Sequence, residues 1–256
     1  MGDLKSEHRR YRALQEEFRQ SEGFRLYHDF LAIRLTFYAF QTNYDELDCL
    51  IRQHYKLSLE HKLGDFYDRV PLDSLLVELT RRLHNFAFAA KSLIEHTRHF
   101  IVRSYGEESA IRAEYDAKVA TSFGPSGIAA FTSGLRNFFG HVTSPFITSV
   151  MAGSDPAPGE PRYRLQLNTA DMDRQPRWKG WSAGARKYIS AHGYDVDLGI
   201  YATEYYEAVM RFYYWLGERN EQWCKDAWDH MIALQDQIQA YEERWGFPAD
   251  RPKRLS

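Results

Sequence analysis

The sequence lacks several features that would place it in a class at once. It contains two cysteines, Cys49 and Cys224, which lie far apart and do not have the spacing of metal ligands. This count excludes a disulfide framework and favours a reducing, intracellular setting. The net charge of −2 gives no general affinity for nucleic acids or membranes, so any such binding requires a local patch.

Long apolar runs and cofactor motifs are also missing. No stretch approaches the ~18 uninterrupted apolar residues of a membrane span, and the N-terminal segment MGDLKSEHRRYR lacks the apolar core of a signal peptide. There is no phosphate-binding loop, glycine-rich dinucleotide turn or nucleophile elbow. We therefore expect a cytoplasmic protein with no cofactor and no membrane partner.

Helical patterning, in contrast, covers most of the chain. We expect helices over residues 4–20, 24–63, 71–106, 107–122, 126–141, 182–192, 196–217 and 218–245. The third of these carries an apolar stripe typical of a core-facing helix, formed by Leu79, Leu83, Phe86, Ala90, Leu93 and Ile101. Residues 162–172 alternate polar and apolar side chains and predict a strand, after a loop over 154–161 that is rich in Pro and Gly.

These elements predict an all-α fold. We expect a helical bundle with long antiparallel helices and a small irregular or β insertion around residues 154–180. A chain of 256 residues suggests one large domain or two small ones. We expect helices over residues 1–65 to pack on a helical domain of residues 66–256, whose insertion covers 152–181, in one compact unit.

The segment SGLRNFFGHVTSP, residues 133–145, carries the strongest chemical signal. Asn137 and His141 are four residues apart, so they share a helix face. That face lies roughly opposite an apolar seam, and Arg136 lies between the two. The seam consists of Ile128, Phe131, Leu135, Phe138 and Phe139.

Arginine, asparagine and histidine together suit the cleavage of RNA. The planar fork of Arg136 matches phosphate oxygens, and His141 can take or give a proton near neutral pH. RNA supplies its own nucleophile, the 2′-hydroxyl, so a base, an acid and a cation suffice without a metal. In-line cleavage needs groups on both sides of the phosphate, and a twofold dimer would bring two copies together.

The residues RNFFGH at 136–141 resemble the R-x4-6-H signature of the HEPN superfamily, whose members often carry Asn, Asp or His directly after the Arg. With LHNFAFAAKSLIEHTRHF at 83–100, the segment is similar to an uncharacterised bacterial branch of such helical proteins. The resemblance covers about residues 70–150. It implies an HEPN-like helical domain, a homodimer through the motif helices, and metal-independent endoribonuclease activity.

The resemblance further implies that Arg136, Asn137 and His141 are catalytic. It suggests a toxin or phage-defence effector, with an antitoxin or another defence-system protein as a partner. Two alternatives stay open: a degenerate module that only dimerises or binds RNA or protein, and an ordinary helix end where Arg136 and His141 meet terminal carbonyls. The loose pattern also fits Arg186 and His192, whereas R-N-x3-H is far more specific.

A polar line on the helix over 71–106 supplies candidate supporting residues. It flanks the apolar stripe and consists of Asn85, Ser92, His96, His99 and Arg103. These side chains could orient Arg136 or contact RNA, and Asn85 and His96 are the preferred ones because they belong to the stretch that resembles the family. The alternative is a solvated helix face.

Residues 162–187 form the best local basic patch. They hold seven Lys or Arg against two Asp, interleaved with Tyr163, Trp178 and Trp181. Single-stranded RNA binds such patches by phosphate contact and stacking, which makes Arg177 and Lys179 candidates for RNA binding. The alternative is an insertion whose tryptophans anchor it to the core. We expect no metal, because Glu95, His96 and His99 lack the spacing of a helical metal site.

Overall fold

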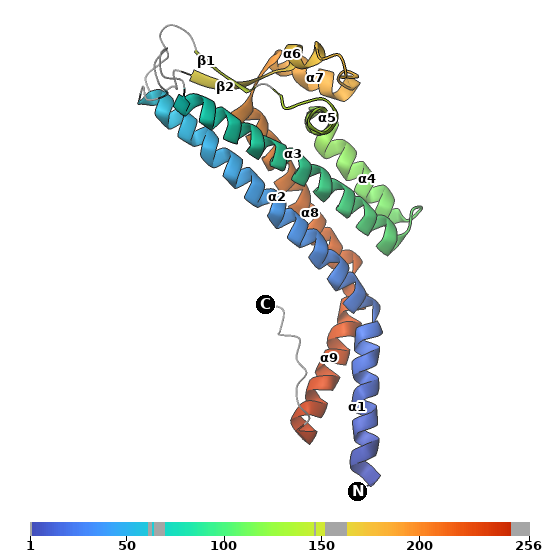
Figure 1. The fold of residues 1–256 in the computed structure, drawn as a ribbon. Helices are drawn as coiled ribbons and strands as arrows, with labels where there is room; N and C mark the ends of the chain where they lie inside the picture. Colours follow the sequence, from blue (N-terminus) through green and yellow to red (C-terminus); the bar gives the residue numbers. More distant parts are fainter. Residues whose placement is uncertain (1, 61–62, 64–69, 146, 152–162, 247–256) are drawn as a thin grey trace. The chain divides into compact units, whose positions relative to one another are not determined.

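The structure is a computed structural model, and it describes residues 2–60, 63, 70–145, 147–151 and 163–246. The elements in chain order are α1 (Gly2–Gln20), α2 (Glu22–Leu59), α3 (Val70–Tyr105), α4 (Ala110–Phe123), α5 (Ile128–His141), β1 (Ile147–Met151), β2 (Tyr163–Asn168), α6 (Thr169–Asp173), α7 (Ala183–His192), β3 (Asp195–Asp197), α8 (Leu198–Trp223) and α9 (Lys225–Trp245). This confirms a mainly helical fold with a small β insertion (Figure 1). Within the described ranges, no helix is long and apolar enough to cross a membrane.

The chain forms two compact units. The larger unit, residues 33–214, contains α3 to α7, the three strands and most of α2 and α8. The smaller unit, residues 1–32 and 215–256, contains α1, α9 and the adjoining ends of α2 and α8. The predicted boundary at residues 65 and 66 and the loop over 154–161 lie outside the described residues. No disulfide joins Cys49 and Cys224, both of which lie within the described residues.

In the larger unit, α2 runs antiparallel to both α3 and α8. Thr36 of α2 contacts His96 of α3, with 3.1 Å between Oγ1 and Nδ1. Further along α2, Phe40 stacks on Phe86, which precedes His96 in the chain. The rings of Phe37 and Tyr213 and those of Tyr44 and Tyr206 show the same reversed order between α2 and α8. The prediction of long antiparallel helices is therefore confirmed.

The predicted apolar stripe of α3 lies in the core of this unit. Each of its members is at most 1% exposed: Leu79, Leu83, Phe86, Ala90, Leu93 and Ile101. Aromatic side chains from α2 and α8 fill the space beside the stripe, because Phe86 meets the rings of Phe40 and Tyr205. Burial of this stripe fixes which face of α3 remains for the candidate site.

The small sheet is larger than the sequence predicts. Its strands lie in the order β1-β2-β3, all antiparallel. The strand predicted over 162–172 is wrong in its second half, because residues 169–173 form α6. The sequence analysis missed β1, in which only Ile147 is fully buried, and β3, which has three residues. Neither strand is long or regular enough to show an alternating pattern.

Side chains near the end of α2 hold all three strands. His54 Nε2 lies 2.8 Å from Ser149 Oγ on β1. The Tyr163 N–H of β2 donates a hydrogen bond to Ser58 Oγ at 2.8 Å. The Tyr55 hydroxyl donates to Asp197 Oδ1 on β3 at 3.4 Å. The insertion is therefore part of the larger unit's body.

The predicted helix end at Gly217 is wrong, and α2 ends at Leu59 rather than at residue 63. The sequence analysis ended a helix at Gly217, but α8 continues to Trp223 and α9 begins after Cys224. A glycine inside a helix costs about 1 kcal/mol relative to alanine. Burial of the flanking Leu216 and Asn220 offsets that cost and keeps the helix continuous.

Candidate active site at the end of helix α5

The apolar seam of α5 sets the rotation of this helix. The buried side chains are Ile128, Phe131, Thr132, Leu135 and Phe138. Phe139, the last member of the predicted seam, is half-buried at its edge. Thr132 adds a polar contact within the core, since its Oγ1 accepts a hydrogen bond from the Tyr201 hydroxyl at 3.0 Å. With this side fixed, the opposite face of the last turn points away from the core.

Helix α7 and the residues before it hold a second side of α5. A Cβ on Gly127, whose φ is 74°, would stand 2.1 Å from the Gly184 carbonyl oxygen. A Cβ on Gly134 would stand 2.7 Å from the ring of Trp181. That ring stacks on Phe131 with 5.1 Å between centroids. The two glycines therefore let the α7 segment sit directly on α5.

Arg136 and Asn137 meet on the last turns of α5. Arg136 Nη1 donates a hydrogen bond to Asn137 Oδ1 at 3.2 Å, and the guanidinium carbon lies 5.1 Å from the ring centroid of Phe88 on α3. Arg136 Nε is enclosed and makes no hydrogen bond with any residue that the structure describes. The guanidinium is thus held between an amide and an aromatic ring, with part of its donor capacity unused.

A carboxylate lies within the electrostatic reach of Arg136. The pKa of Glu95 on α3 is lowered, mainly because Lys91 donates a hydrogen bond to it. The positive charge of Arg136 lowers the pKa of Glu95 further. The ion pair of Lys91 and Glu95 on α3 is therefore close enough to the motif to feel the charge of Arg136.

His141 is the last residue of α5, and it is exposed. It makes no hydrogen bond or ion pair within the part of the chain that the structure describes. The carbonyl of Phe138 accepts hydrogen bonds from the N–H groups of Val142 at 2.9 Å and Thr143 at 3.3 Å. Because backbone groups close this helix end, the interpretation of Arg136 and His141 as carbonyl caps has no contact to support it.

The structure adds His84, a histidine that the sequence analysis did not select. Its ring stacks on Phe88 with 4.3 Å between centroids and meets Phe139 edge-on at 5.1 Å. Its Nδ1 lies 3.5 Å from Asn85 Oδ1. A Cβ on Gly140 would stand 3.8 Å from Phe88, so the last turn of α5 passes over this group. The spacing of His84 and Phe88, four residues apart and next to Asn85, was the available signal.

The side chains of the predicted polar line on α3 lie in two different environments. Asn85 is half-buried and belongs to the group around His84. His96 is exposed and bonds to Thr36 of α2, about three turns further along α3 than Asn85. His99 and Arg103 are exposed further along α3. Asn85 therefore lies with the motif, whereas a role in RNA contact for the other three stays a prediction.

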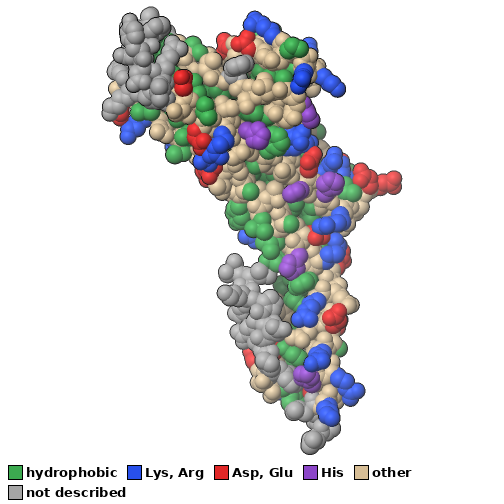
Figure 2. All heavy atoms as spheres, in the orientation of Figure 1, with side chains coloured by type: hydrophobic (Ala, Val, Ile, Leu, Met, Phe, Trp, Pro, Cys, Tyr) green, Lys and Arg blue, Asp and Glu red, His purple; other side chains and the backbone are tan. Residues whose placement is uncertain are grey.

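The basic segment is anchored by its tryptophans. Trp181 is 5% exposed, and Trp178 packs edge-on against both Trp181 and Phe138 at 5.3 Å. This is the contact expected of an insertion fixed to the core, and it leaves neither ring fully open for stacking on bases. Arg177 and Lys179 are exposed. Figure 2 shows Lys and Arg side chains protruding where Figure 1 places α6 and α7.

The second match to the loose pattern has a different environment. On α7, Arg186 Nε donates a hydrogen bond to the Trp181 carbonyl oxygen at 3.1 Å. The His192 ring stacks on Tyr188 at 4.1 Å, and its Nδ1 lies 3.0 Å from the Tyr188 carbonyl oxygen. His192 Nε2 also lies 3.4 Å from a carboxylate oxygen of Glu204. Both side chains hold the local structure together.

Neither a metal cluster nor a known relative identifies this site. Among the described residues, no three His, Cys, Asp or Glu side chains gather in a way that could hold a metal ion. Comparisons with family models, curated proteins and solved structures found no match to this chain. The likeness to the HEPN superfamily therefore stays a prediction from the sequence.

Proposed function

We propose that this protein is a metal-independent endoribonuclease of the HEPN type. The observation that carries the proposal is the end of α5, where Arg136 bonds to Asn137 at 3.2 Å and His141 follows on the same face, exposed. Arg136 would bind the scissile phosphate, His141 would transfer a proton, and Asn137 would orient Arg136 or the substrate. As a cytoplasmic enzyme it would act as a toxin or phage-defence effector, restrained by an antitoxin or another defence-system partner.

The proposed reaction uses a nucleophile within the RNA. The 2′-oxygen attacks the adjacent phosphorus and loses its proton to one histidine, the bond from phosphorus to the 5′-oxygen breaks, and that oxygen takes a proton from a second histidine. The products are a 2′,3′-cyclic phosphate and a 5′-hydroxyl. Arg136 stabilises the charge on the phosphorane oxygens. Acid and base groups of this kind contribute about 10²–10⁴ in rate.

A second copy of the chain would supply the second histidine. Each chain carries one R-N-x3-H segment, and acid and base must stand on opposite sides of the phosphate. A twofold axis beside the exposed end of α5 would bring His141 of the partner subunit to the other side. A homodimer is therefore part of the proposal.

The test is cleavage of end-labelled RNA by the purified protein in EDTA. We expect the wild type to leave 2′,3′-cyclic phosphate ends, and His141→Ala and Arg136→Ala to leave the RNA intact. Equal cleavage by all three proteins would show that the activity belongs to another site or to a contaminant. Absence of cleavage by a folded wild-type dimer would count against the proposal.

A non-catalytic module is the second candidate, and one observation favours it. Arg136 is half-buried, with its guanidinium over Phe88 and its Nε enclosed. An arginine in such a place can serve packing alone. In that case Arg136→Ala would lower the thermal stability of the chain and abolish its dimerisation or binding of RNA or protein, with no cleavage by the wild type to lose.

A further inference from the structure

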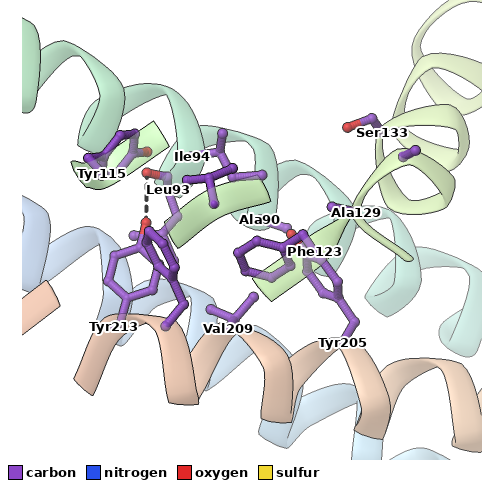
Figure 3. A pocket seen from close by; sticks show the side chains of 13 residues that line it. Ala90, Leu93, Ile94, Tyr115, Phe123, Ala129, Ser133, Tyr205, Val209 and Tyr213 are labelled. Carbon is purple, nitrogen blue, oxygen red and sulfur yellow. Dashed lines mark hydrogen bonds between the residues drawn. The ribbon is translucent and has the colours of Figure 1, made fainter. Parts of the chain in front are cut away.

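A cavity of about 250 Å³ lies inside the larger unit, between α3, α4, α5 and α8 (Figure 3). Carbon atoms form most of its wall, and the apolar lining residues outside α5 are Ala90, Leu93, Ile94, Val119, Phe123, Val209 and Phe212. The lining that the structure describes includes no Lys, Arg, Asp or Glu. Such a wall disfavours a charged occupant, because nothing in it offsets the loss of hydration.

The hydroxyls of Tyr115, Ser133 and Tyr205 line this cavity without a hydrogen bond to the described residues, and Tyr205 is the most deeply buried of the three. The side chain is 1% exposed and points from α8 toward Ala90 of α3 (Figure 3). Its hydroxyl makes no hydrogen bond with the residues described in the structure. Tyr213, at the other end, differs, because its hydroxyl donates to the Leu93 carbonyl oxygen at 3.2 Å and lies 2.6 Å from Thr97 Oγ1. Buried hydroxyls are normally paired, and the Tyr205 hydroxyl can therefore bond to a polar group that enters the cavity.

We propose that the cavity binds a neutral, mainly apolar alcohol or phenol whose hydroxyl bonds to Tyr205. An apolar cavity of 150 Å³ takes benzene. By the same proportion, a cavity of 250 Å³ takes about ten non-hydrogen atoms, the size of a two-ring aromatic. The apolar wall would contact the rings of the occupant, and the Tyr205 hydroxyl would form a hydrogen bond with the hydroxyl of the occupant.

The occupant would rest against the helix that carries the candidate catalytic residues. Ala129, Ala130 and Ser133 of α5 line the cavity. Ser133 precedes Asn137 by four residues on the same helix, hence by about one turn. Binding in the cavity does not depend on the proposed ribonuclease activity, so either proposal can fail without the other.

The test is isothermal titration of the full chain with naphthol, and with naphthalene and naphthoate as matched probes. We expect naphthol to bind and the charged naphthoate not to bind. Tyr205→Phe removes only the hydroxyl, so it should weaken naphthol binding about fivefold and leave naphthalene binding unchanged. Ala129→Leu fills the cavity and should abolish binding of both neutral probes. Ala117→Leu, the same change at an exposed position of α4, is the control.

Two results would overturn the proposal. One is a folded wild type that takes up no naphthol at the solubility limit of the probe. The other is wild-type binding by Ala129→Leu, or by Val119→Phe, which fills the cavity from α4 in case the first variant does not fold. Equal naphthol affinity of the wild type and Tyr205→Phe would show that the occupant makes no hydrogen bond with the Tyr205 hydroxyl, which contradicts that part of the proposal.

Discussion

Helices α5 and α7 each carry an arginine followed by a histidine at similar spacing, yet the two pairs have different surroundings. On α7, Arg186 bonds to a backbone carbonyl and His192 stacks on a core tyrosine. On α5, Arg136 bonds to the neighbouring amide side chain, and His141 is exposed without a hydrogen bond to any described residue. Arg186 and His192 are exposed as well, so the two pairs differ mainly in the contacts that they make within the fold.

The difference shows that spacing alone does not mark a functional site. A side chain that already makes contacts within the fold loses free energy if binding a phosphate breaks those contacts. The structure therefore separates two motifs that the loose sequence pattern treats alike. Matched substitutions in α5 and α7 test this difference.

Truncation of the anchor before α7 should have the greatest effect on folding. Trp181→Ala removes the ring that stacks on Phe131 and packs against Trp178. We expect a loss of about 3–5 kcal/mol in the free energy of unfolding, measured by urea denaturation. Tyr194→Ala, at an aromatic side chain that is 65% exposed, should change it by less than about 0.5 kcal/mol. Similar losses in both variants would show that Trp181 does not anchor α7.

Alanine substitutions at Arg136 on α5 and Arg186 on α7 should have different effects on the rate of RNA cleavage. Arg136→Ala should lower the rate of RNA cleavage about 10²–10³-fold, because the phosphorane loses a charged donor. Arg186→Ala should leave the rate within about twofold, since the guanidinium is bound to the Trp181 carbonyl oxygen. Single-turnover rates on one labelled RNA give both values. A matching loss in Arg186→Ala would contradict the assignment.

His54 on α2 differs from both His141 and His192, because its side chain is fully buried. Burial lowers its pKa from 6.5 to about 4. In the unfolded chain it binds a proton below about pH 6.5, so its contribution to stability is complete above that pH and is lost as the pH falls toward 4. The loss is about 2–3 kcal/mol.

Urea denaturation between pH 4.5 and 7 measures this contribution. Other groups also titrate in this range, so the comparison is with His54→Gln, which cannot take up the proton. We expect the wild type to lose more stability on acidification than the variant does. Parallel pH profiles would show that His54 is protonated equally in the folded and unfolded chains.

Alanine substitutions at His192 and His141 should change the free energy of unfolding by smaller and unequal amounts. His192→Ala removes the stack on Tyr188 and the contact with its carbonyl oxygen, so we expect a loss of about 1 kcal/mol. His141→Ala should stay within about 0.5 kcal/mol of the wild type, because the side chain is exposed. Thermal melting of both variants checks this. A larger loss in His141→Ala would indicate that this side chain is structural.

Much of the fold could be predicted from the sequence because helix periodicity repeats over many turns. The apolar stripe of α3 and the seam of α5 are buried as predicted, apart from the half-buried Phe139. Short elements carry too few repeats, and so β1 and β3 were missed. Gly217 predicts a helix end because its low helix propensity is visible in the sequence, whereas the tertiary burial of Leu216 that overrides this propensity is not.

The candidate site was predictable only along a single helix. The shared face of Asn137 and His141 follows from a spacing of four residues. The contact of Arg136 with Phe88 joins two helices, and no local pattern encodes the register between them. For the same reason the sequence does not reveal that His84 lies beside the motif or that His96 contacts Thr36 of α2.

The decisive measurement is the rate of RNA cleavage in EDTA by His141→Ala beside His192→Ala, at equal concentrations of folded protein. If the end of α5 is the active site, His141→Ala should be slower than His192→Ala by about 10²–10⁴-fold, and His192→Ala should match the wild type. Equal rates in the two variants would contradict the assignment of the site to α5.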